Sequence, residues 1–230
     1  MDFNAVVTAP QDMRSEEFAD MISGEIMDNC EKRMIESIVR SEFPHLLSDD
    51  RAEVCAIALR EASPDSGEVI NAIHYNRRRA LIADEVLGCL NENQSIVLSG
   101  LINFRLSDYK NELRNLCFNA YDEYEAEREY NEFLEMLSFF VSVQSPREDT
   151  VYLVKRRGRL RILNRKKRDI TDIYFSEFPA PPEGLTDEDI ALSALISIAP
   201  LHIMVADYEE NEKIYQTIKA IFSDVRFKQP

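Results

Sequence analysis

The sequence predicts an α+β protein: an N-terminal all-helical bundle with one long helix, then a small C-terminal α+β domain with a β-hairpin and about four strands. The position of Ser145-Pro146 separates two patterns. Before it, apolar residues recur every three or four positions, as on one face of a helix; after it they alternate with polar residues, as in a strand. We therefore expect a helical domain over 1–145 and a small α+β domain over 150–230.

Three helices are expected before the long one, over about 15–40, 48–62 and 68–90. The first has an apolar residue at every fourth position from Phe18 to Ile38. The second opens with a serine and two aspartates, which favour a helix N-terminus because the helix dipole is positive there. Proline, glycine or asparagine follows each segment, as is typical of helix ends.

The long helix is predicted by the segment between Gly100 and Pro146, which contains no glycine or proline. Apolar residues follow one stripe at spacings of three and four for about 40 residues, which is ~60 Å of helix if unbroken. Ser107 is expected to cap it. The outer face is acidic, with seven acidic residues and one arginine from Asp122 to Glu135. Such a helix indicates the spine of a bundle.

The C-terminal domain begins with two strand-like runs, VYLVK (151–155) and RLRIL (159–163), on either side of Arg156-Arg157-Gly158. Because glycine adopts positive φ readily, this tripeptide predicts a hairpin loop of three or four residues. Thr186 and Asp189 have the spacing of a capping box, with aspartate in place of glutamate. Two further strands are expected at 201–206 and 225–228. Three helices are expected at 169–178, 187–199 and 209–222, and a loop at 179–184.

The composition is that of a folded soluble protein, with 45% hydrophobic and 30% charged residues in 230. No apolar run approaches the ~20 residues needed to cross a bilayer. The first residues lack the basic flank and apolar core of a signal peptide, so we expect a cytoplasmic protein. The four cysteines form no CxxC pair, which favours reduced thiols in the core over disulfides or zinc.

Motifs that carry chemistry are missing from the sequence. The six glycines are too widely spaced for a phosphate-binding loop, and the three histidines lack metal-ligand spacing. No serine or cysteine sits in a recognisable nucleophile motif. We therefore expect no enzymatic activity, no catalytic residues, no cofactor or metal, and no small-molecule substrate.

Three segments resemble stretches of one protein family. They are LINFRLSDY (101–109), DEYEAEREYNEFLEMLSFFVSVQSP (122–146) and LSALISIAPLHIMV (192–205). These segments are similar to the YtxC-like sporulation proteins of endospore-forming bacteria. The resemblance implies a role in sporulation and a soluble helical protein with a small C-terminal domain, and it implies no reaction. The basic character of the hairpin departs from the family pattern.

The first of these segments contains a second candidate site. Its residues are Asn103, Arg105, Asp108 and Tyr109. On a helix, Arg105 shares a face with Asp108 and Tyr109, so the group could bind a partner or ligand. The sequence favours the alternative, a helix-entry corner in which Phe104 and Leu106 anchor the chain, Ser107 caps the long helix and Arg105 pairs locally.

The principal candidate site is the basic stretch KRRGRLRILNRKKR (155–168), which holds nine of the 27 basic residues and no acid. The protein has a net charge of −15; without the stretch, 18 basic residues face 42 acidic ones, a charge of −24. Strand alternation predicts that Arg159 and Arg161 converge with Lys155 and Arg157. The nine residues are Lys155, Arg156, Arg157, Arg159, Arg161, Arg165, Lys166, Lys167 and Arg168.

Three kinds of partner fit a basic stretch in an acidic protein. The first is an acidic protein surface, which could be a separate partner, a second copy or the 122–135 face of the same chain. The second is nucleic acid, opposed by the remaining charge of −24 and by the lack of aromatic residues among the basic ones. The third is an anionic membrane, for which apolar anchors are missing. The sequence favours the protein partner, with nucleic acid as the alternative.

Overall fold

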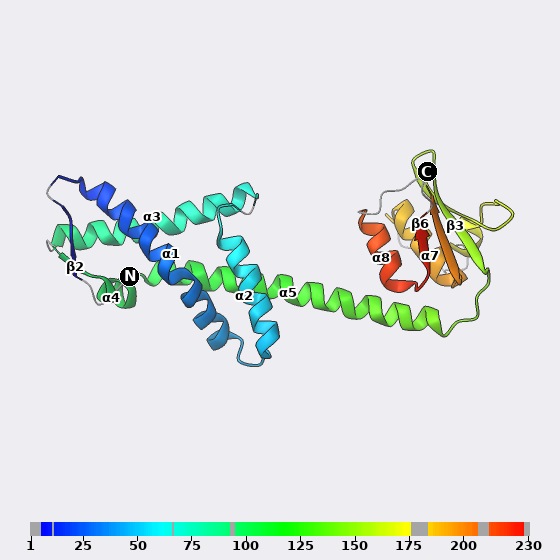
Figure 1. The fold of residues 1–230 in the computed structure, drawn as a ribbon, viewed down its shortest axis with the longest axis horizontal. Helices are drawn as coiled ribbons and strands as arrows, with labels where there is room; N and C mark the ends of the chain where they lie inside the picture. The colour runs from blue at the N-terminus through cyan, green and yellow to red at the C-terminus, as the bar shows by residue number, and fades with distance from the viewer. Residues whose placement is uncertain are drawn as a thin grey trace. The chain divides into compact units, whose positions relative to one another are not determined.

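The structure, a computed structural model, contains two compact units, Met1–Glu127 and Arg128–Pro230 (Figure 1). Helices make up most of the first unit, and the second is built on a four-stranded sheet. The predicted α+β class is confirmed. The structure describes residues 6–10, 12–65, 67–92, 95–175, 184–206 and 212–227.

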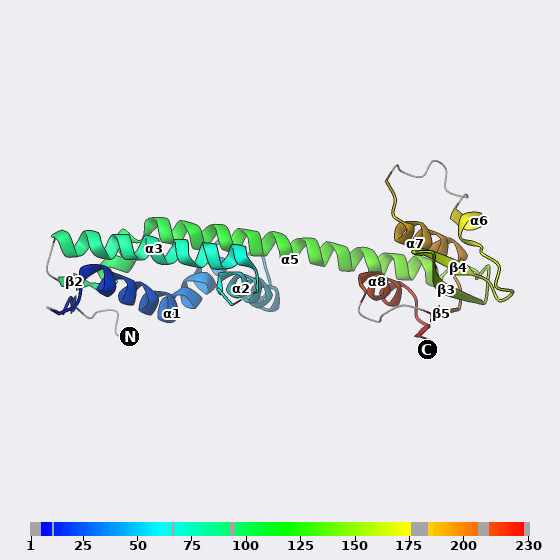
Figure 2. The same cartoon turned by 90° about the horizontal axis from the view of Figure 1, so that it is seen from above.

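The first unit contains three helices close to the predicted ranges and the beginning of a fourth. Figure 2 shows the first two of them beneath α3 and the first part of α5. Their buried faces form one apolar core, to which Ile26, Ile82 and Leu113 contribute side chains with no exposed surface. The four helices are α1 (Ser15–Glu42), α2 (Ser48–Ala62), α3 (Val69–Glu92) and α5 (Ser107–Ser142).

A two-stranded antiparallel sheet also belongs to this unit, so the expectation of an all-helical bundle was wrong. Strand β1 (Val6–Thr8) pairs with β2 (Ser95–Val97), and Val7 lies opposite Ile96. Ile96 is buried and joins the core. This sheet was not predicted because strands of three residues are too short to establish an alternating pattern.

The entry to the long helix is not regular. The short helix α4 (Leu98–Gly100) leads into a π-helical turn, η1 (Leu101–Arg105), and α5 begins two residues later. The N–H of Leu106 donates to the carbonyl oxygen of Leu101, five residues back. This wider turn moves Leu101 and Leu106 into the core together.

A charged network lies inside the first unit. The Arg78 guanidinium on α3 is 1% exposed; it contacts a Glu31 carboxylate oxygen at 2.9 Å and donates to the Ala62 carbonyl at 2.6 Å. The Tyr109 hydroxyl of α5 donates to the other Glu31 oxygen at 2.7 Å. Burial and the neighbouring Glu31 charge raise the pKa of Tyr109 far above its usual value, so the hydroxyl keeps its proton. The network joins four helices.

The second unit holds a sheet in the order β4-β3-β5-β6. Strand β4 is antiparallel to β3, whereas β3, β5 and β6 run parallel. Parts of the predicted 169–178 helix, 179–184 loop, 209–222 helix and last strand lie outside the described residues. The strands are β3 (Thr150–Arg156), β4 (Arg159–Leu163), β5 (His202–Ala206) and β6 (Val225–Phe227), and the helices are α6 (Thr171–Phe175), α7 (Asp187–Ile198) and α8 (Lys213–Ile221).

One face of this sheet is buried. Val151, Leu153, Ile203 and Val205 are at most 1% exposed and cluster with apolar side chains of α7 and α8. Helix α7 begins with the predicted capping box, in which the Thr186 hydroxyl accepts from the Asp189 N–H at 3.1 Å.

The end of α5 contributes to this second core. Leu134 and Val141 pack among the apolar residues of the second unit, which begins at Arg128. The sequence placed the boundary after residue 145, where the period changes, because one continuous helix keeps the same period whichever core it contacts.

Candidate functional site

The hairpin at the centre of the basic stretch turns tightly. Arg156 and Arg159 lie opposite each other, so the loop consists of Arg157 and Gly158 alone. Both have positive φ, 53° and 80°. Two consecutive residues of this kind are characteristic of the two-residue turns that match strand twist. The loop is shorter than the predicted three or four residues because an arginine, as well as the glycine, takes up the left-handed conformation.

The shorter loop changes which side chains share a face. Opposite residues of an antiparallel pair project to the same side of the sheet, so Arg156, Arg159 and Arg161 lie on the outer face. Lys155 is opposite Leu160 and belongs to the side covered by helices. The predicted convergence of Lys155, Arg157, Arg159 and Arg161 is therefore wrong. A change of one residue in the length of the loop shifts the register of the strands, so that the residues opposite Arg159 and Arg161 come from the other face of β3.

Two arginines of the hairpin are paired within the unit. Arg161 contacts Asp172 of α6 at 3.0 Å and Asp169 at 3.9 Å. Arg159 lies 3.8 Å from Asp187 at the start of α7. These two side chains link β4 to the neighbouring helices.

The loop after β4 displays four basic residues, 165–168, on a hydrogen-bonded backbone. The Asn164 side-chain oxygen accepts from the N–H groups of Lys166 at 3.0 Å and Arg168 at 3.1 Å. The Asn164 N–H donates to the Arg168 carbonyl at 2.9 Å, and the Lys167 N–H donates to the Asn164 carbonyl at 2.8 Å. An asparagine before a tight turn is a sequence signal for this arrangement, which the distribution of charge alone does not indicate.

The basic stretch thus forms two exposed clusters, one at each end of β4. We call Arg156 and Arg157 the tip cluster and residues 165–168 the loop cluster. Five residues of β4 separate them, a distance of about 17 Å along the strand. Within the parts of the chain that the structure describes, no ion pair holds any of these six side chains, whereas at least nine of the thirteen arginines outside the stretch contact an acid.

The second candidate site does not assemble. Arg105 pairs with Glu92 at 2.6 Å, while Tyr109 is buried in the network with Glu31. Phe104 is 85% exposed, so of the two predicted anchors, Phe104 and Leu106, only Leu106 is buried. The four predicted residues, Asn103, Arg105, Asp108 and Tyr109, therefore share no site in the structure.

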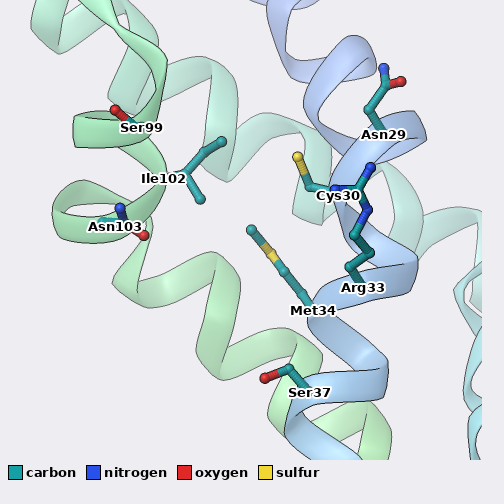
Figure 3. A pocket seen from close by; sticks show the side chains of 8 residues that line it. All are labelled: Asn29, Cys30, Arg33, Met34, Ser37, Ser99, Ile102 and Asn103. Carbon is teal, nitrogen blue, oxygen red and sulfur yellow. The ribbon is translucent and has the colours of Figure 1, made fainter. Parts of the chain in front are cut away.

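Asn103 does line a pocket of about 310 Å³ between α1 and the α4–η1 segment (Figure 3). Cys30, Met34 and Ile102 point toward one another across it. Burial raises the pKa of the Cys30 thiol, although the charge of Arg33 lowers it, so the thiol is protonated at neutral pH. The pocket can accept a small apolar group, and its lining provides no acid–base pair.

A second, polar cleft of about 530 Å³ lies beside α3 and includes His74, Glu61 and Glu112. Glu112 pairs with Arg77 at 2.9 Å. Burial and the neighbouring Glu123 carboxylate raise the pKa of Glu61. The described residues contain no group of three or more His, Cys, Asp or Glu side chains placed to bind one metal ion. All four cysteines are free thiols.

These features define a two-unit α+β protein whose C-terminal unit presents basic side chains on a fixed backbone. The chain belongs to the YtxC-like family, whose profile matches residues 16–225. It is 23% identical over 194 residues to "Uncharacterized protein YtxC" of Bacillus subtilis (strain 168), an alignment that covers 82% of this chain and 67% of that protein. No solved structure matches the chain. Among the described residues, no helix has the length and apolar character of a membrane span.

Proposed function

We propose that this protein is a non-enzymatic, cytoplasmic, sporulation-associated binding protein whose basic stretch recognises an acidic surface of a protein partner. The observation that carries the proposal is the pair of basic clusters, whose six side chains have no ion-pair partner in the described parts of the chain. The sporulation role follows from the resemblance of segments 101–109 and 122–146 to sporulation proteins.

The fixed backbone of the loop cluster supports a recognition role. Asn164 holds the turn through hydrogen bonds to the backbone of Lys166 and Arg168. A partner therefore orders only side chains when it binds, which lowers the entropic cost of association.

The separation of the two clusters restricts the partner. A surface that engages both must carry acidic groups about 17 Å apart, the length of β4. Exposed ion pairs contribute only ~0–1 kcal/mol each, so the clusters set orientation and partner choice more than affinity.

Nucleic acid is the second candidate, and two observations favour it. The C-terminal unit (128–230) carries 15 basic and 17 acidic residues, a charge of −2, whereas residues 1–127 carry 12 and 25, a charge of −13. Repulsion of a polyanion therefore originates mainly in the first unit. In addition, Tyr152 shares the outer face of the sheet with Arg156 and Arg161 and can stack on a base.

The proposal is tested by affinity capture with the full chain in extracts of sporulating cells. The loop-cluster variant Arg165→Gln/Lys166→Gln/Lys167→Gln/Arg168→Gln is compared with a control, Arg60→Gln/Arg114→Gln, whose arginines are paired with Glu123 and Glu42. We expect an acidic protein to be captured by the wild type and the control and lost from the loop-cluster variant. Equal capture by all three would contradict the proposal.

A further inference from the structure

The last part of α5 carries a second apolar face that no described residue covers. The spacing of its residues is three, four and three, which places them along one side of a helix. Phe139 lies beside them and is 70% exposed. We call these five residues the α5 stripe. The other four are Phe133, Met136 and Phe140 of α5 and Val143, the residue directly after its end, which are 49%, 60%, 53% and 65% exposed.

The stripe is not the face that attaches α5 to its own unit. Leu134 and Val141 pack into the C-terminal core, and the Tyr130 hydroxyl hydrogen-bonds to that of Thr217 at 2.9 Å. Leu134 is about 100° around the helix from Phe133. A surface helix in a monomer needs one apolar face, so the second face remains unexplained by folding.

We propose that the α5 stripe is the interface of a homodimer, in which it packs against the same stripe of a second copy in antiparallel orientation. The exposed fractions of its five side chains leave roughly 500 Å² of apolar surface on one chain. Two copies together then bury about 1,000 Å², the lower limit for a specific interface. A two-fold dimer needs one self-complementary surface, and a seam with heptad spacing on a continuous helix provides one.

The charges beside the stripe decide the orientation. Glu129, Glu132 and Glu135 cluster at its start, where Arg128 lies 3.6 Å from Glu132 and offsets one of the three charges, and no acidic residue follows until Glu148. Parallel packing would set the three glutamates against their copies. In the antiparallel arrangement each acidic cluster faces the acid-free end of the other helix. The two clusters are then separated by up to about 20 Å, more than twice the Debye length of about 8 Å at physiological salt.

This inference is independent of the proposed function because different side chains carry it. Dimerisation would place two basic surfaces on one particle, and both could engage a repetitive or dimeric acidic partner.

The test is the molar mass of the full chain in solution, by light scattering and sedimentation between 1 and 100 μM. We expect a concentration-dependent dimer. The variant Phe133→Gln/Phe140→Gln should weaken the dimer about 100-fold, because central aromatic residues dominate such interfaces. Its circular dichroism should match the wild type, since both side chains are exposed.

Matched controls distinguish association through this interface from non-specific hydrophobic association and from association through the basic stretch. Leu47→Gln/Ile173→Gln removes two exposed apolar side chains outside the stripe, 73% and 60% exposed, and should leave the dimer unchanged, as should the loop-cluster variant. Glu129→Gln/Glu132→Gln should also leave it unchanged; tighter association would indicate parallel packing. A monomeric wild type at 100 μM overturns the proposal, whether or not the stripe variant loses a captured protein.

Discussion

Two arginine-rich segments of this chain are similar in sequence but differ in how many acidic side chains lie beside them. Each of the three consecutive arginines of α3 contacts an acid of the same unit: Arg77 with Glu112, Arg78 with Glu31, and Arg79 with Asp20. The tip and loop clusters of the C-terminal unit, in contrast, have no ion-pair partner among the described residues. A run of basic residues stays unpaired within its own unit only where the fold places no acidic side chains beside it, and the run itself does not indicate this.

The largest loss of stability is expected from replacing Arg78, the buried arginine of α3. Arg78→Met leaves the Glu31 carboxylate buried without its counter-charge, so the free energy of unfolding should fall by about 3–5 kcal/mol. Arg156→Met, in the exposed tip cluster, should change it by less than about 0.5 kcal/mol. Urea denaturation of the two variants measures the difference. Similar losses of unfolding free energy in both variants would contradict the distinction between a buried, paired arginine and an exposed, unpaired one.

A smaller loss is expected from the hydroxyl that completes the same network. Tyr109→Phe leaves one Glu31 oxygen without its 2.7 Å hydrogen bond, which should cost about 1–3 kcal/mol of unfolding free energy. Because Arg78 and Tyr109 share Glu31, the double variant should lose less than the sum of the single losses. Additive losses would show that the two groups act independently.

Alkaline pH should also distinguish the units. Burial raises the pKa of Cys117 from 9.0 to about 12, and that of Tyr109 well above its usual 10.0. Groups with raised folded pKa values contribute stability that is complete below the unfolded pKa and is lost above it. The first unit should therefore lose stability as the pH rises from about 9 towards 12. Thermal melts across this range check the direction; unchanged stability up to pH 11 would contradict it.

A smaller loss of stability than in the buried network of the first unit is expected beside the loop cluster. Asn164→Ala removes the side-chain acceptor that holds the turn but keeps every charge, so the free energy of unfolding should fall by about 1 kcal/mol. Binding of an acidic partner should weaken several-fold, because the loop must then be ordered on association. Titration calorimetry with the captured partner measures this. Unaltered affinity would mean that charge alone, without a fixed backbone, accounts for recognition.

The fold was predictable where patterns were long. The ranges of α1, α2 and α3, the two strands of the hairpin and the Thr186–Asp189 capping box all follow from periodicity or local hydrogen-bonding chemistry. The β1–β2 sheet was missed because its strands have three residues each. The π-helical turn escaped notice because a periodic apolar stripe passes through it.

The candidate site was only partly predictable for a different reason. The sequence located all nine basic residues. The register of the hairpin, however, depended on the positive φ of Arg157, a backbone conformation that arginine rarely adopts. Burial of Arg78 depended on Glu31, 47 positions away in sequence. Which charges are paired is a property of tertiary contacts, so local reasoning could not separate the α3 arginines from those of the loop cluster.

We propose that the basic clusters recognise acidic protein surface rather than nucleic acid. Fluorescence anisotropy with labelled duplex and single-stranded DNA and RNA at ~150 mM salt tests it most directly, because phosphate contacts alone make such binding strongly salt-dependent. We expect weak binding to each probe, with the variant Arg157→Gln/Arg159→Gln/Arg161→Gln/Lys166→Gln/Lys167→Gln differing little from the wild type. Sub-micromolar binding that these five substitutions abolish would contradict it.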